Sequence, residues 1–229
     1  MQTTIDTFNK RVSEITLYYD ALKSLYDEKK QKNNCQKYCE DDFLKILKAN
    51  ALLMIYNLVE SAIMGGITEI YDDLQQQGVT YRQVRSEIQQ IWFTFKFNQA
   101  YDKTAHYNAY KDKAVEIINS ILSDEILMLD RKAINVSGNL DAKKIIRICK
   151  DHGIYCQIDP NCKGGYVLED IKTRRNELAH GTLSFVECGR DYTIEDLEKI
   201  KAQTILFLEG ILNSMQDYYT KQLYLQVAQ

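Results

Sequence analysis

Eight residues in the last third of the chain set its expected architecture: Arg174-Arg175-Asn176-Glu177-Leu178-Ala179-His180-Gly181. Apolar residues recur around them at helical spacing and predict a helix over about 167–180: Val167, Leu168, Ile171 and Leu178. Gly181 is the residue type that most often follows a helix end. Two arginines stand where the apolar stripe should continue, and a guanidinium there is costly unless it is paired or faces water.

This octet has two interpretations. It can be a capping cluster, in which His180 bonds the terminal carbonyls and the arginines pair with Glu177 or Glu60. It can also be a reactive site, because histidine transfers protons near neutral pH and arginine binds phosphate through parallel hydrogen bonds. The octet alone leaves both interpretations open.

The composition predicts an all-α protein. Of 229 residues, 45% are hydrophobic and 27% charged, with ten glycines and one proline. So few helix breakers favour long helices over a turn-rich β fold, and no linker or repeat stands out, so we expect one domain over residues 1–229. The net charge of −3 excludes a chain that is basic throughout. Any RNA contact must therefore come from a local patch or from two subunits together.

The most apolar stretch, residues 49–68, has Glu60 as its only charge. Its length approaches a membrane span, but its asparagines, glycines and amphipathic surroundings favour a buried core helix. The N-terminus lacks the apolar segment typical of a secretion signal. We therefore expect a cytoplasmic protein without membrane contact, whose six cysteines are reduced thiols.

A zinc site is the one metal centre that the sequence suggests, with four candidate ligands: Cys149, His152, Cys156 and Cys162. Their spacing matches no common zinc finger or ribbon, so buried or half-exposed thiols are the preferred interpretation. His152 lies beside a predicted helix end and is expected to be a capping or surface residue. We therefore expect neither a metal nor a cofactor.

Three helices are predicted in the first hundred residues. Residues 4–30 carry an apolar seam that packs either on the protein's own core or on a second copy. After a polar break at 29–34, residues 36–76 form one helix that is apolar nearly all round and is therefore the centre of the bundle. Gly78 ends this helix, and residues 84–95 carry the apolar stripe of the next one.

The second half is predicted to be less regular. A helix capped by Thr104 extends to about residue 129. Residues 131–166 form a small irregular insertion before the motif helix, with a short helix after Asp141 and a small two-strand pairing. Residues 182–191 are expected to be a loop or short hairpin, and a long final helix follows.

Asn57 and Glu60 are three residues apart on the central helix and share one of its faces. A single carboxylate in a buried run needs a partner, and so do the arginines of the octet. We therefore predict that Glu60, with Asn57, lies against Arg174 or Arg175. The alternative is that Glu60 reaches water at a helix edge.

Arg175-Asn176 followed by His180 resembles the Arg-x(4–6)-His motif of the HEPN superfamily, in which a polar residue commonly follows the arginine. The order of flanking segments is similar over roughly residues 40–215: Tyr56-Asn57-Leu58-Val59-Glu60, Ser137-Gly138-Asn139-Leu140-Asp141, Ser184-Phe185 and Tyr192-Thr193. The resemblance implies a HEPN-like bundle of long helices that dimerises across paired motif helices. In many members it also implies a metal-independent endoribonuclease.

The resemblance further implies residue roles. His180 transfers protons, Arg175 stabilises the phosphate, and Asn176 positions the ribose or His180. The supporting residues are Arg174, Glu60 and Asn57. On one regular helix Arg175 and His180 point about 140° apart. Either the last turn unwinds at Gly181, or a second copy completes the site.

The partners implied by the resemblance are RNA, a second copy of the chain, and an antitoxin or defence-system protein. A catalytically inactive HEPN module that binds RNA or a protein stays open as the alternative. In HEPN toxins that are silenced by nucleotidylation, a tyrosine follows the motif histidine by two residues. Here that residue is Thr182, which argues against this form of regulation.

Overall fold

The computed structural model describes residues 1–32, 41–99, 107–134 and 139–226. Within these ranges the chain is built from helices, with no β-strand and two isolated β-bridges. The all-α prediction is therefore confirmed. Thr104, predicted as a helix cap, and the Ser137-Gly138 pair of the resemblance lie outside the described residues.

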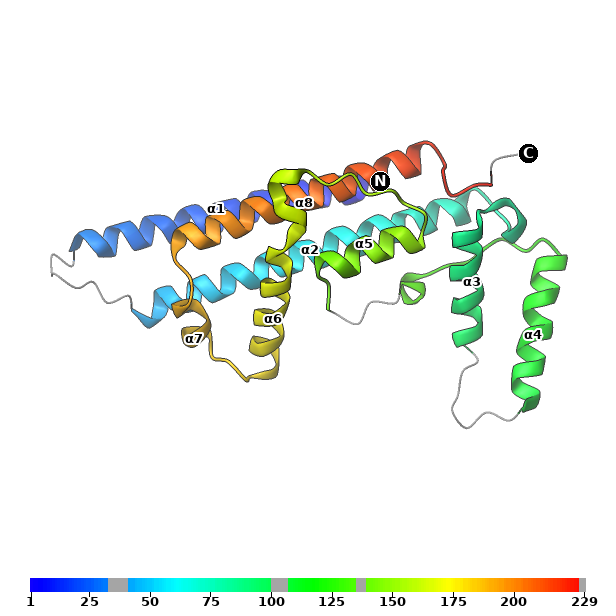
Figure 1. The fold of residues 1–229 in the computed structure, drawn as a ribbon, viewed down its shortest axis with the longest axis horizontal. Helices are drawn as coiled ribbons and strands as arrows, with labels where there is room; N and C mark the ends of the chain where they lie inside the picture. Colours follow the sequence, from blue (N-terminus) through cyan, green and yellow to red (C-terminus); the bar gives the residue numbers. More distant parts are fainter. Residues whose placement is uncertain (33–40, 100–106, 135–138, 227–229) are drawn as a thin grey trace.

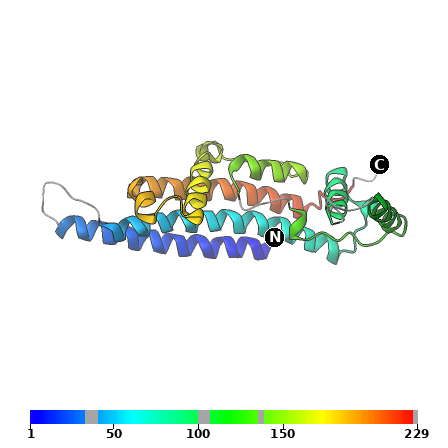
Figure 2. The ribbon, with the colours of Figure 1, turned by 90° about the horizontal axis from the view of Figure 1, so that it is seen from below.

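Three long helices run side by side along the length of the molecule (Figures 1 and 2): α1 Gln2–Lys32, α2 Asp42–Gln76 and α8 Ile194–Thr220. α2 packs against α1, α6, α7 and α8 and is the centre of the bundle, as predicted. It starts later than the predicted residue 36, because the Asp41 side chain accepts a hydrogen bond from the Leu44 N–H (2.9 Å) and caps the helix. The polar break predicted at 29–34 begins too early, since α1 continues to Lys32.

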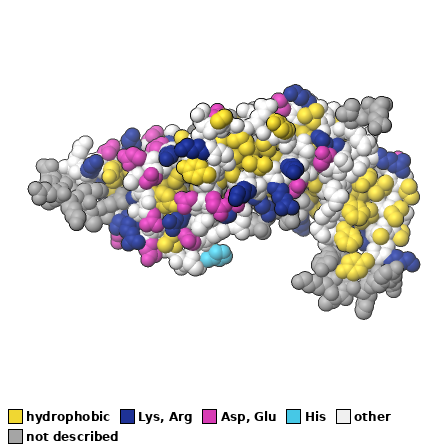
Figure 3. Space-filling model, in the orientation of Figure 1, with side chains coloured by type: hydrophobic (Ala, Val, Ile, Leu, Met, Phe, Trp, Pro, Cys, Tyr) yellow, Lys and Arg dark blue, Asp and Glu magenta, His cyan; other side chains and the backbone are white. Residues whose placement is uncertain are grey.

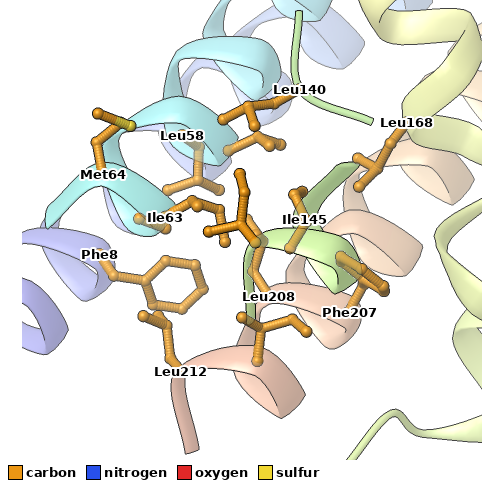
Figure 4. Close-up of a cluster of buried hydrophobic side chains, with 14 of the residues drawn as sticks. Phe8, Leu58, Ile63, Met64, Leu140, Ile145, Leu168, Phe207, Leu208 and Leu212 are labelled. Carbon is orange, nitrogen blue, oxygen red and sulfur yellow. The ribbon is translucent and has the colours of Figure 1, made fainter. Parts of the chain in front are cut away.

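The core explains why α2 is so apolar. By length and composition alone α2 could cross a membrane, but 61% of its most apolar window is buried inside the protein. Side chains from α1, α2, α5, α6 and α8 meet there in one cluster (Figure 4), which includes Phe8, Leu58, Ile145, Leu168 and Phe207. Full burial of each such side chain stabilises the fold by about 2 kcal/mol.

α3 Ser86–Asn98 and α4 Tyr107–Leu122 project from one end of the long helices (Figure 1). α4 does not reach residue 129 as predicted, because the backbone after it pairs with the segment that follows α2. There the Leu127 N–H donates a hydrogen bond to the Val79 carbonyl (2.8 Å). Apolar side chains remain exposed on this pair of helices (Figure 3): Phe93, Phe97, Val115, Ile118 and Leu122.

The region predicted as an irregular insertion contains η2 Arg131–Ala133, α5 Ala142–Asp151 and η3 Pro160–Gly165. α5 starts after Asp141, as predicted, because the Asp141 side chain accepts a hydrogen bond from the Lys144 N–H (2.8 Å). The predicted strand pairing is absent from the described part of the insertion. Its residues 154–158, which form no regular secondary structure, instead lie along α8, where the Gln157 N–H donates to the Ser214 hydroxyl (2.9 Å).

α6 Val167–His180 occupies the range predicted for the motif helix and crosses the long helices (Figure 1). The prediction of a loop or hairpin over 182–191 is wrong, because α7 Phe185–Arg190 forms there. A capping box between Ser184 and Glu187 starts this helix. Gly189 lets its backbone rest on α2, since a Cβ at this position would lie 1.8 Å from the Lys45 carbonyl oxygen.

Candidate functional site

Two features hold α6 and end it where the motif ends. Its buried residues Val167, Leu168, Ile171 and Leu178 face the core, so the opposite face of the helix points outward. Gly181 adopts a left-handed conformation (φ 70°), and the Thr182 N–H donates to the Glu177 carbonyl (3.0 Å). This closure satisfies the last carbonyls without unwinding the helix before His180.

Arg174 belongs to a cluster that joins α6 to the start of α8. Its guanidinium lies 3.1 Å from Asp191, 3.2 Å from Glu177 and 3.7 Å from Asp170. Its Nε donates to the Tyr192 hydroxyl (3.2 Å), which in turn donates to Asp170 (2.6 Å). The pKa of Tyr192 is raised, first by burial and then by its hydrogen bond to Asp170. Three carboxylates therefore neutralise Arg174.

Arg175 has a different environment. Its guanidinium lies over the Tyr56 ring of α2, 4.5 Å from the ring centre, and donates to the Asn176 side-chain oxygen (2.9 Å). The Asn176 amide donates in turn to the side chain of Asn139, and the Tyr56 hydroxyl accepts from the Leu140 N–H (3.3 Å). No carboxylate forms an ion pair with Arg175 among the described residues. Its charge is therefore positioned by neutral groups and remains available to an anion.

His180 ends α6 as an exposed side chain and has no hydrogen bond or ion pair within the described parts of the chain. It is five residues from Arg175 on a regular helix, which places the two side chains about 140° apart around the axis. One copy of α6 therefore does not aim both residues at the same phosphate. The capping interpretation is confirmed for the pairing of an arginine with Glu177, which Arg174 makes (3.2 Å). It is wrong for His180, which bonds no terminal carbonyl among the described residues.

The predicted contact between Glu60 and the arginines is wrong. Glu60 and Asn57 point to the other side of α2 and line a groove of about 600 Å³ with residues of α1, Arg11 among them. Asn57 is exposed, and Glu60 is half-buried at the helix edge, as the alternative interpretation expected. An α-helix turns by about 100° per residue, so successive positions of a buried helix face different neighbouring helices. The buried run of α2 alone therefore does not determine which neighbour a polar side chain meets.

Three further residues complete the surroundings of the motif. Tyr56 supports Arg175, Asn139 holds Asn176, and Tyr192 holds Arg174. All three occur in the sequence segments that carry the HEPN resemblance, so their order in the chain was the available signal. Sequence reasoning missed their individual roles, because none of them is a charged residue that demands a partner.

α6 is also fastened to α5. Lys172 bridges Asp141 (2.8 Å) and Glu169 (2.9 Å). Burial disfavours the charge on Asp141, but bonds from Lys172 and from the Lys144 N–H outweigh it and hold the pKa of this carboxyl below its usual range. The pair fixes the start of α5 beside the middle of α6.

The candidate zinc ligands are arranged for packing. Among the described residues, no group of three or more histidine, cysteine and acidic side chains is close enough to hold a metal ion. His152 ends α5 as a buried residue, not as a surface one, and its ring nitrogens face the Tyr71 hydroxyl (2.6 Å) and the Ile148 carbonyl (2.7 Å). Burial lowers the pKa of His152.

Comparison with known proteins places this geometry in a family. Residues 1–224 match the family model described as MAE_28990-like HEPN. Searches of curated proteins and of solved structures returned no match. The family match covers nearly the whole chain, including the helix that carries Arg175, Asn176 and His180, and the all-helical fold agrees with it. The chain therefore belongs to the HEPN superfamily, as one of its MAE_28990-like members.

Proposed function

We propose that the protein is a metal-independent endoribonuclease whose active site is completed by a second copy of the chain. The different environments of the two motif arginines carry this proposal. Arg174 is neutralised by three carboxylates, whereas Arg175 is oriented by Tyr56 and Asn176. Arg175 is therefore the arginine available to a phosphate, and Arg174 is the one that holds the structure.

The regular geometry of α6 supports a composite site. The helix stays regular to His180, so unwinding does not bring His180 towards Arg175. A two-fold arrangement of paired α6 helices would instead set His180 of one copy beside Arg175 of the other. It would also bring two Arg175 guanidiniums into one cleft, which provides a local positive charge in a chain whose net charge is −3.

The chemistry follows from these groups. The ribose 2′-oxygen attacks the adjacent phosphorus, and the bond from phosphorus to the 5′-oxygen breaks. The His180 of one copy accepts the proton of the 2′-hydroxyl, and water donates a proton to the leaving 5′-oxygen. Arg175 stabilises the charge that accumulates on the phosphate oxygens. The products are a 2′,3′-cyclic phosphate and a 5′-hydroxyl.

The proposed biological role rests on the resemblance to HEPN toxins and defence proteins alone. We infer a toxin or defence effector that acts on RNA in the cytoplasm, with an antitoxin or another defence protein as its partner. Wild-type expression should slow cell growth, and expression of His180→Ala should not. Equal growth of both strains would count against a toxic effector.

The direct test is cleavage of mixed cellular RNA by purified protein in EDTA, beside His180→Ala and Arg175→Ala. We expect cleavage by the wild type only, with cyclic phosphate ends. Equal cleavage by all three proteins would identify a contaminant. No cleavage by a dimeric wild-type protein would favour the alternative, an inactive HEPN module that binds RNA or a protein.

A further inference from the structure

A groove of about 840 Å³ lies between α3, η2 and α5, away from the motif residues. Apolar side chains such as Ile91, Phe95 and Ile148 contribute to its lining. Gln90, Thr94 and Asn98, whose side chains can form hydrogen bonds, also line it. A lining that combines apolar surface with hydrogen-bonding groups suits the faces and edges of nucleic-acid bases.

Basic side chains surround this groove. Lys132, Lys144, Arg147 and Lys150 line it, and Figure 3 shows Lys and Arg side chains gathered over α5. The groove also contains two carboxylates, but Glu87 is paired with Arg85 (2.9 Å) and Asp151 with Arg147 (3.8 Å). In the part of the chain that the structure describes, none of the three lysines forms an ion pair. The groove therefore carries an excess of positive charge in a chain whose net charge is −3.

The position of α5 connects this groove to the motif helix. The first turn of α5 is fastened to α6 by Asp141 and Lys172, and Asn139, just before it, bonds Asn176. From there α5 runs for ten residues, or about 15 Å, and carries Lys144, Arg147 and Lys150 along its length. A polyanion that passes Asn176 can follow α5 into the groove.

We propose that this groove binds a single strand of RNA, with phosphates on the lysines and bases over the apolar lining. The inference rests on the proposed function, because it places the flanking part of the same RNA substrate. Its ligand is an extended strand and not a single nucleotide, because the basic residues are distributed along a whole helix.

The test measures RNA binding in a His180→Ala background, so that binding is read without cleavage. A fluorescent single-stranded RNA of about 20 nucleotides is titrated at several salt concentrations. Lys132→Gln, Lys144→Gln and Lys150→Gln are combined in one variant. We expect its affinity to fall at least about tenfold and the slope of log K against log salt to decrease by about 2.

The matched control removes three exposed lysines of α1 and α8: Lys10→Gln, Lys23→Gln and Lys199→Gln. This control variant changes the net charge by the same amount as the groove variant, and its affinity for RNA should stay within about twofold of that of the His180→Ala parent. Equal weakening in both triple variants, or no weakening in the groove variant, would overturn the proposal. Displacement of the strand by AMP at matched phosphate concentration would also overturn it.

The two proposals fail separately. If RNA binding depends on the groove lysines but the wild type cleaves no RNA, the ribonuclease proposal is rejected and the groove proposal stands. If the wild type cleaves RNA but the groove variant binds RNA normally, the groove proposal is rejected and the ribonuclease proposal stands.

Discussion

Arg174 and Arg175 are neighbours in the sequence, yet their replacement should have opposite consequences. Arg174→Met keeps the aliphatic packing of the side chain and removes its charge. The three ion pairs with Asp170, Glu177 and Asp191 are partly exposed, so each contributes about 0.5 kcal/mol after solvent screening. The hydrogen bond to Tyr192 adds about 1 kcal/mol. The variant should therefore lose roughly 2.5 kcal/mol of the free energy of unfolding.

Urea unfolding followed by circular dichroism measures this loss. With a slope of about 2 kcal/mol per molar urea, the urea midpoint of Arg174→Met should fall by about 1.2 M. The difference from the wild type should shrink in 1 M salt, because salt screens exposed ion pairs. At urea concentrations below its unfolding midpoint, where the variant is still folded, Arg174→Met should cleave RNA.

Arg175→Met is the matched control. It removes the contact with Tyr56 and the bond to Asn176 and should lose only about 1 kcal/mol of stability. Its cleavage rate should nevertheless fall at least about a hundredfold, because it lacks the group that stabilises the phosphate. A folded Arg174→Met without activity, beside an active Arg175→Met, would refute the assignment of the two arginines.

Three further predictions concern stability, and urea unfolding checks each of them. The unfolded chain protonates His152 below about pH 6.5, whereas burial keeps the folded histidine neutral to lower pH. The free energy of unfolding should therefore decrease below pH 6.5, by up to about 1.4 kcal/mol per pH unit, and His152→Phe should remove this component. Gly189→Ala places a Cβ against the Lys45 carbonyl and should lose at least about 3 kcal/mol. Gly181→Ala has open space around it and should lose only about 1 kcal/mol, from its left-handed conformation. A free energy of unfolding that does not change between pH 6.5 and lower pH would contradict the role given to His152. Equal losses of stability in Gly189→Ala and Gly181→Ala would contradict the role given to the close contact at Gly189.

The parts of the fold that were predictable are those in which a local pattern determines the structure. The motif helix has an apolar stripe that starts at Val167 and a glycine directly after His180, so both of its ends could be read. The same holds for α5, which begins after the cap at Asp141. α7 was missed because it has only six residues and its capping box at Ser184 was not recognised.

The candidate site was only partly predictable, because its partners come from distant segments. The need of a buried carboxylate for a charged partner led to the prediction that Glu60 pairs with the arginines. In the structure, Arg174 instead pairs with carboxylates of its own helix and of the turn before α8. Arg175 lies over the Tyr56 ring. Which face of α2 meets α6 depends on how the whole bundle packs, and hydrophobic periodicity carries no such information for a helix that is buried nearly all round.

The most direct measurement of the composite site mixes two inactive variants. Arg175→Ala and His180→Ala are purified separately, exchanged through mild denaturation and assayed for RNA cleavage in EDTA beside the wild type. If Arg175 and His180 act from different copies, each mixed dimer retains one complete site, and the mixture should recover about a quarter of wild-type activity. An active wild type with a mixture no more active than either variant alone would show that the two residues act within one copy and would contradict the composite site.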